Sequence, residues 1–242
     1  MLEIFVLRLV IGMLGALVVL PRKEVPPRFF RIHLLIALGL LCLTGIAAVP
    51  RDAATFWVGL GLAGAACFAG TWFWMAEPDA LGLVPIMLAI LASAGSLSVC
   101  LASKAPQPWL ILDNATAAAQ LGFALTAMLL GHYYLIAPGM SVRPLVRLTW
   151  LLIVSIVARA VVSLAHYGFV CVSNGGVLAS LDRGLWFALR GLAGIVAALI
   201  FGYLAYRCAR LRSTQSATGI LYAATIASFL GELAQLLLEH TT

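Results

Sequence analysis

The chain has 242 residues, of which 63% are hydrophobic and only 10% charged, and its mean hydropathy is +1.07. Soluble domains typically have about half apolar and about a quarter charged residues, so this composition excludes a water-soluble globular protein. The net charge of +6 does not indicate nucleic-acid binding, because the basic residues lie in short connections between apolar runs.

Apolar runs separated by proline, glycine or charged residues predict eight membrane spans. None alternates with the two-residue period of a membrane barrel. Because every backbone polar group in the bilayer core must be hydrogen-bonded internally, we expect an all-α fold, a polytopic membrane helix bundle. About 20 apolar residues are needed for each crossing. In chain order, the predicted spans are residues 2–20, 32–49, 57–76, 81–103, 116–137, 148–170, 185–206 and 218–237.

The basic residues predict the orientation of these spans. The connections after the first, fifth and seventh spans hold nine Lys and Arg residues, and the opposite connections hold three. Since basic loops stay in the cytoplasm, we expect both termini on the outer, periplasmic side of a cell inner membrane. The nine are Arg22, Lys23, Arg28, Arg31, Arg143, Arg147, Arg207, Arg210 and Arg212, and the three are Arg51, Lys104 and Arg183.

The whole chain, residues 1–242, is interpreted as a single integral membrane domain. Three residues after the first span recur with the same spacing after the fifth, which suits a 4+4 helix repeat with halves 1–115 and 116–242. The alternative is a chance match. The matched residues are Pro21, Val25 and Pro27 against Pro138, Val142 and Pro144. Pro85 lies within the fourth predicted span, where we expect a kink.

Two spans carry polar residues on one helical face. Ionisable groups in the hydrocarbon layer cost at least ~2.5–3.5 kcal/mol each near its centre, so these faces predict helices that meet a protein interior or a wet cavity rather than lipid. The sixth span holds Ser155, Arg159, Ser163 and His166; the eighth holds Thr218, Thr225, Ser228, Glu232 and Gln235.

Glu232 is the one acid deep within the predicted spans, and we expect it to pair with Arg190, Arg159 or Arg8. One interpretation is a buried ion-pair network that fixes the helix register. The other is that the surplus of three arginines binds an anionic group, such as a haem propionate, a lipid phosphate or a carboxylate substrate. Asp113 is assigned to an outer loop.

Two histidines near the cytoplasmic border suggest a haem site. His33 opens the second span and His132 closes the fifth, and membrane b-type haems are held by histidines with arginine at the propionates. We therefore consider His33 and His132 as ligands of haem iron. The alternative is an interfacial histidine that binds water or a backbone carbonyl. Their charged and aromatic neighbours are Arg28, Arg31, Phe29, Phe30, Tyr133 and Tyr134.

Quinone binding is the related hypothesis. A quinone needs hydrogen-bond partners at its carbonyl oxygens that also pass protons. Two candidate sets of residues fit this need. The outer set is Arg159, His166, Arg190 and Glu232, and the inner set is His132, Tyr133 and Tyr134.

These residues predict a membrane subunit of an electron-transfer or respiratory complex that interacts with quinone, b-type haem or both. Any enzymatic role would then be that of a membrane anchor of an oxidoreductase, with the bilayer and other subunits as partners. The alternatives are a small-molecule transporter or channel with an intramembrane Arg/Glu site, and a non-catalytic scaffold subunit. The polar segment 212–219 is interpreted as a capped turn at the lipid headgroups or, alternatively, as a phosphate cradle.

Overall fold

The computed structural model describes residues 1–48, 53–75, 80–102, 108–137, 139–174, 185–186 and 188–240. Within these ranges the regular secondary structure is helical, without strands, and eight helices are long and apolar enough to cross a membrane. The predicted all-α fold with about eight membrane helices is therefore confirmed. The chain divides into two compact units, Leu2–Pro106 and Gln107–Thr242.

The first unit is a ring of four helices. Each helix packs on its neighbours along the chain, and α1 also packs on α4, as in an up-and-down bundle. Phe30 stacks on Trp74 with ring centroids 4.0 Å apart, and Trp74 Nε1 donates to the Gly82 carbonyl at 3.0 Å. The helices are α1 (Leu2–Val19), α2 (Pro27–Ala47), α3 (Ala54–Phe73) and α4 (Leu83–Cys100), with the 3-10 turn η1 (Ala80–Gly82) before α4.

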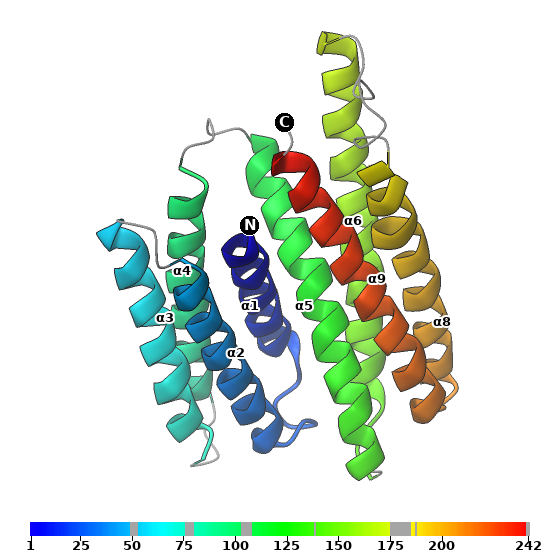
Figure 1. Cartoon of the computed structure of the whole chain (residues 1–242). Helices are drawn as coiled ribbons and strands as arrows, with labels where there is room; N and C mark the ends of the chain where they lie inside the picture. Colours follow the sequence, from blue (N-terminus) through cyan, green and yellow to red (C-terminus); the bar gives the residue numbers. More distant parts are fainter. Residues whose placement is uncertain are drawn as a thin grey trace. The chain divides into compact units, whose positions relative to one another are not determined.

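The second unit repeats this arrangement, with one irregular span. Helix α5 packs on α6 and α9, and α8 packs on the same two helices (Figure 1). The seventh span begins as a π-helix, η2, which continues directly into α8. The elements are α5 (Pro108–Ile136), α6 (Arg143–Asn174), η2 (Arg190–Ala197), α8 (Ala198–Arg210) and α9 (Thr214–His240). Each unit thus holds four spans, and the internal duplication stays a prediction.

Proline explains where several helices begin. Helices α2 and α5 start at Pro27 and Pro108, and Pro144 is the second residue of α6, so these helices begin five to eight residues before the predicted spans. Proline suits the first helical turn because its φ is preset and its missing N–H has no helical acceptor there. Pro85 likewise lies in the first turn of α4, and the expected kink in the fourth span stays a prediction.

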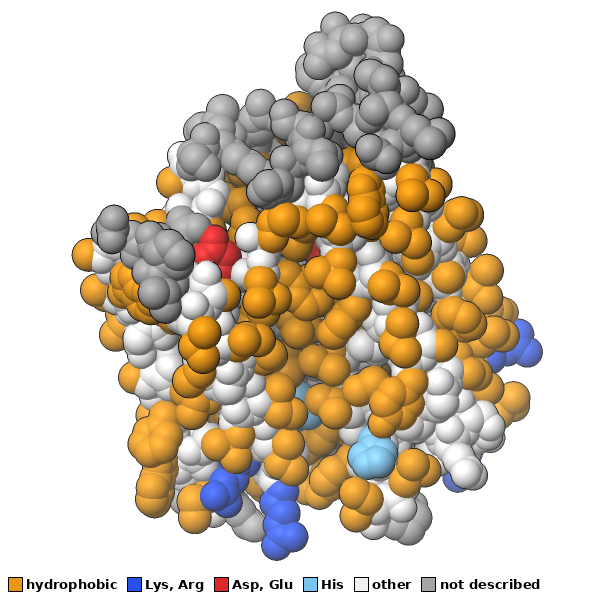
Figure 2. All heavy atoms as spheres, in the orientation of Figure 1, with side chains coloured by type: hydrophobic (Ala, Val, Ile, Leu, Met, Phe, Trp, Pro, Cys, Tyr) orange, Lys and Arg blue, Asp and Glu red, His pale blue; other side chains and the backbone are white. Residues whose placement is uncertain are grey.

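The surface is that of a lipid-exposed bundle. Large apolar side chains are exposed on the helices, including Ile46 at 71% and Leu164 at 73%. Hydrophobic side chains predominate on the face shown in Figure 2, and only a few Lys and Arg side chains appear on it. The chain is therefore a multi-pass membrane protein. Its orientation stays a prediction, since Arg51, Lys104 and Arg183 lie outside the described residues.

Candidate functional site

The two predicted polar faces point into the second unit. Their members are at most 7% exposed, which confirms that α6 and α9 turn these stripes toward protein. The buried residues are Ser155, Arg159 and Ser163 on α6, and Thr218, Thr225, Ser228, Glu232 and Gln235 on α9. The side chain of His166, also predicted for this face, lies outside the described part of the chain.

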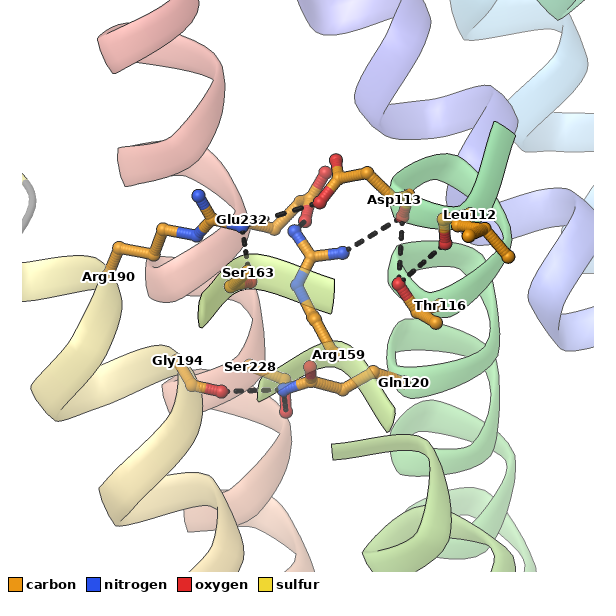
Figure 3. Close-up of polar contacts among 10 residues, drawn as sticks. All are labelled: Leu112, Asp113, Thr116, Gln120, Arg159, Ser163, Arg190, Gly194, Ser228 and Glu232. Atoms are coloured by element: carbon orange, nitrogen blue, oxygen red, sulfur yellow. Dashed lines mark hydrogen bonds and ion pairs between the residues drawn. The ribbon is translucent and has the colours of Figure 1, made fainter. Parts of the chain in front are cut away.

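Arg159, on the buried polar face of α6, makes hydrogen bonds to two other helices. Its Nη2 donates to Glu232 Oε2 at 2.5 Å, which confirms one of the predicted pairings for Glu232. Its Nη1 donates to the backbone carbonyl of Asp113 at 3.3 Å. One guanidinium group therefore joins α6 to both α9 and α5 (Figure 3).

Asp113 adds a second carboxylate. It is the sixth residue of α5, so its assignment to an outer loop is wrong, because Pro108 starts the helix earlier than predicted. Its Oδ1 accepts from Arg190 Nη2 at 3.3 Å, and the same Nη2 donates to Ser163 Oγ at 2.8 Å. Asp113, Arg159, Arg190 and Glu232, from α5, α6, η2 and α9, are called the charge network below (Figure 3).

The charge network contains two guanidinium and two carboxylate groups. The expected surplus of three arginines over one glutamate is therefore wrong for this unit, because Asp113 balances Arg190. The third arginine, Arg8, is fully buried on α1 of the first unit. A balanced network needs no anionic ligand for neutrality. Its guanidinium groups can donate hydrogen bonds, and carboxyl groups are among the side chains that can transfer protons.

A second layer of polar contacts lies beside the charge network, where η2 joins α8. The backbone N–H groups at this junction donate to the carbonyls of Ala193 and Ile195. The carbonyl between them, that of Gly194, accepts from Gln120 Nε2 at 2.7 Å, and Gln120 also donates to Ser228 Oγ at 3.2 Å. Gln120 thus supplies a side-chain donor to a backbone carbonyl within the π-helix. Such π-segments recur at functional sites.

A backbone contact holds η2 against α9 at the same level. A Cβ added to Gly231 would lie 2.1 Å from Gly194 Cα, and one added to Gly194 would lie 2.7 Å from Gly231 Cα. Only two glycines permit this approach. Gly194 lies one turn after Arg190 and Gly231 directly precedes Glu232, so the contact fixes the spacing of the two helices that carry them.

Sequence reasoning missed Asp113, Gln120 and the two glycines. A signal exists on α5, where a small or polar residue recurs every three or four positions; Asp113 is half-buried and the four that follow it are buried. This periodicity marks one helical face, but the predicted span began at 116 and so excluded its first member. The face comprises Asp113, Ala117, Gln120, Ala124 and Ala127.

His33 is buried in the first unit, at 1% exposure. Its Nδ1 donates to the Phe29 carbonyl at 2.8 Å, and its ring centroid lies 4.0 Å from that of Phe29. Its Nε2 is buried without a hydrogen-bond partner among the described residues. Metal-ligating histidines commonly donate their other N–H to a carbonyl, so His33 fits the role of a haem ligand.

The other inner candidates lie in the second unit, near the end of α5. His132 is exposed, Tyr133 is half-buried, and the buried Tyr134 donates its hydroxyl to the Ser141 carbonyl. At a rise of ~1.5 Å per residue, His132 lies about 28 Å along α5 from Asp113. The inner set is therefore separate from the charge network. Because His33 and His132 belong to different units, the haem between them stays a prediction.

Fold and site define a class: a multi-pass helical membrane protein with a buried, charge-balanced network in its second four-helix unit. No family model matches the sequence, and neither a curated protein nor a solved structure matches the chain.

Proposed function

We propose that this protein is an integral membrane subunit of an electron-transfer or respiratory complex, and that quinone interacts with it at the charge network. One observation carries the proposal. Four ionisable side chains from four helical segments are joined by hydrogen bonds inside the second unit. Ionisable groups at membrane depth are costly, and they commonly mark proton or ligand pathways.

The donors and acceptors of the network suit the head group of a quinone. Reduction to quinol adds two electrons and two protons, and a redox centre of a partner subunit would supply the electrons. Arg159, Arg190 and Ser163 supply N–H and O–H donors for the quinone carbonyl oxygens. Asp113 and Glu232 supply carboxyl groups that can relay the two protons.

A b-type haem belongs to the same proposal, and His33 and His132 are the residues that would hold its iron. When bound, haem supplies one-electron transfer. His33 supports it through its buried Nε2 and its Nδ1 hydrogen bond to Phe29. A visible absorption spectrum of the purified protein tests this part. A Soret band that disappears in His33→Ala is expected, and a colourless protein at full recovery would rule out haem.

Glu232→Gln tests the quinone site. The substitution keeps the shape of the side chain and removes its charge, which leaves Arg159 without its carboxylate partner. Turnover is therefore compared per folded protein, and we expect loss of quinone-dependent turnover in the folded fraction. Thr225→Val is the matched control, because Thr225 is also buried on α9 but, among the described residues, its hydroxyl donates only to the Leu221 carbonyl of its own helix. Full turnover in Glu232→Gln contradicts the proposal, as does a protein that purifies alone, stable and without quinone.

A transporter or channel that uses the same network is the second candidate. The π-helix favours it, since interrupted helices near a membrane binding site are typical of transporters. Solute flux into liposomes that Glu232→Gln abolishes would select this function over the redox subunit. A scaffold subunit would show neither flux nor redox difference spectra.

A further inference from the structure

A second polar site lies at the other end of the same unit. A pocket of about 710 Å³ opens between the start of α6 and the end of α8. Four arginines line it together with two aromatic residues. They are Arg143, Arg147, Arg210, Arg212, Trp150 and Tyr206.

The four arginines are not neutralised by neighbouring acids. None of the residues that line the pocket is acidic. None of the four guanidinium groups forms an ion pair within the described part of the chain. All four side chains are exposed and line one pocket without an acidic residue, so the positive potential of the pocket favours an anionic ligand. Arginine binds phosphate oxygens through its planar fork of N–H donors.

The turn after α8 carries an independent sign of function. Arg212 has φ of 58°. Its N–H donates to the Ala209 carbonyl and the N–H of Ser213 donates to the Cys208 carbonyl. This is the Schellman pattern, in which the residue at the Arg212 position is usually glycine because a Cβ is unfavourable there. The chain therefore has a strained arginine where glycine would be more stable, and that arginine lines the pocket.

The surroundings of the pocket suit a lipid. Trp150 and Tyr206 lie at the ends of two spans with ring centroids 5.9 Å apart, and such residues occupy the headgroup level of a bilayer. Arg210 lies over the Tyr206 ring at 5.8 Å. Basic pockets between the ends of membrane helices bind anionic headgroups. We propose that this pocket binds the phosphate of an anionic phospholipid headgroup.

Lipid retention by the full-length protein tests the proposal. The protein is exchanged into vesicles of phosphatidylglycerol mixed with phosphatidylcholine, and bound lipids are counted by native mass spectrometry. We expect phosphatidylglycerol to be retained preferentially. Each Arg→Gln substitution in the pocket should weaken its binding roughly fivefold, at about 1 kcal/mol per charge, and Arg147→Gln with Arg210→Gln about 25-fold.

Two control variants separate a pocket from general surface charge. Arg207→Gln removes an exposed arginine one turn from Arg210 that binds Tyr203 and does not line the pocket. Arg28→Gln with Arg31→Gln removes two exposed arginines from α2. Both should retain phosphatidylglycerol as the native chain does. Equal losses in the control and pocket variants would overturn the proposal, as would equal retention of phosphatidylcholine.

Two further measurements complete the test. Arg212→Gly should raise the Tm, because it relieves the strained backbone, and yet reduce lipid retention. A raised Tm with unchanged retention would contradict the role of this side chain. Inorganic phosphate at millimolar concentration should not displace the lipid. Displacement, with tight binding of phosphate alone, would assign the pocket to a soluble anion and overturn the lipid assignment.

Discussion

At the scale of single residues, the Arg159–Glu232 pair makes the clearest energetic prediction. Arg159→Met leaves the Glu232 carboxylate buried without its main partner, which should lower the free energy of unfolding by about 3–5 kcal/mol. Adding Glu232→Leu removes both charges and should recover much of that loss. A double-mutant cycle on unfolding in mixed detergent micelles measures the coupling. Additive losses would contradict a direct pair.

Gln120 makes a second prediction at this scale. Gln120→Leu leaves the Gly194 carbonyl buried without its side-chain donor, and we expect a loss of about 1–3 kcal/mol of unfolding free energy. Thr126→Val on the same helix is the control. The Thr126 hydroxyl is buried without a hydrogen-bond partner in the described structure, so its removal should be neutral or stabilising. The same micelle assay compares the two variants. Equal losses of unfolding free energy would contradict a stabilising role of the Gln120 hydrogen bond.

The ion pair of Glu232 with an arginine could be predicted from the sequence, because a single acid deep in the membrane has only a few arginines that can neutralise it. The role of Asp113 was not predicted, because a polar residue close to a proline resembles a loop. The hydrogen bond from Gln120 to the Gly194 carbonyl could not be predicted, for a different reason. A π-segment changes which carbonyl lacks a helical donor, and no residue type marks that change in advance.

At the scale of helices, the contact between η2 and α9 predicts a position-specific effect of alanine. Gly231→Ala would place a methyl group 2.1 Å from Gly194 Cα, so the helices must separate. We expect the free energy of unfolding to fall by at least about 1–3 kcal/mol, as for overpacked cores. We also expect quinone-dependent turnover to fall, because the contact fixes the spacing of the helices that carry Arg190 and Glu232.

Gly219→Ala is the matched control on α9, since a Cβ there meets nothing within 4 Å. This substitution should be neutral or stabilise the helix by up to about 1 kcal/mol. Thermal unfolding of both variants measures the contrast. A Gly231→Ala variant as stable as Gly219→Ala would show that the two helices are not in backbone contact.

Helix number and the inward faces of α6 and α9 were predictable, since both follow from composition and periodicity along one segment. The starts of α2, α5 and α6 were predicted too late, because charged and proline residues in a first turn look like connections. Contacts between helices, such as Gly194 with Gly231, depend on packing partners that one segment does not specify.

At the scale of the whole molecule, the excess of Lys and Arg in alternate connections makes a prediction about sidedness. An alkaline phosphatase reporter fused after Thr242 should be active, because the enzyme functions only on the outer side. The same reporter fused after Gly139, between α5 and α6, should be inactive. A green fluorescent protein fused at these two positions is the control and should give the opposite signals. Reversed signals would contradict the predicted orientation.

The order of the charge network along the chain has a consequence for biosynthesis. Asp113 is synthesised well before Arg190, and Arg159 well before Glu232, so the two ion pairs are interleaved in time. A chain that ends before α9 lacks the carboxylate partner of Arg159, at a cost of at least ~2.5–3.5 kcal/mol in the bilayer. Insertion of the last helix therefore completes neutrality, and incomplete chains carry an intramembrane charge by which cellular quality control can distinguish them from the finished protein.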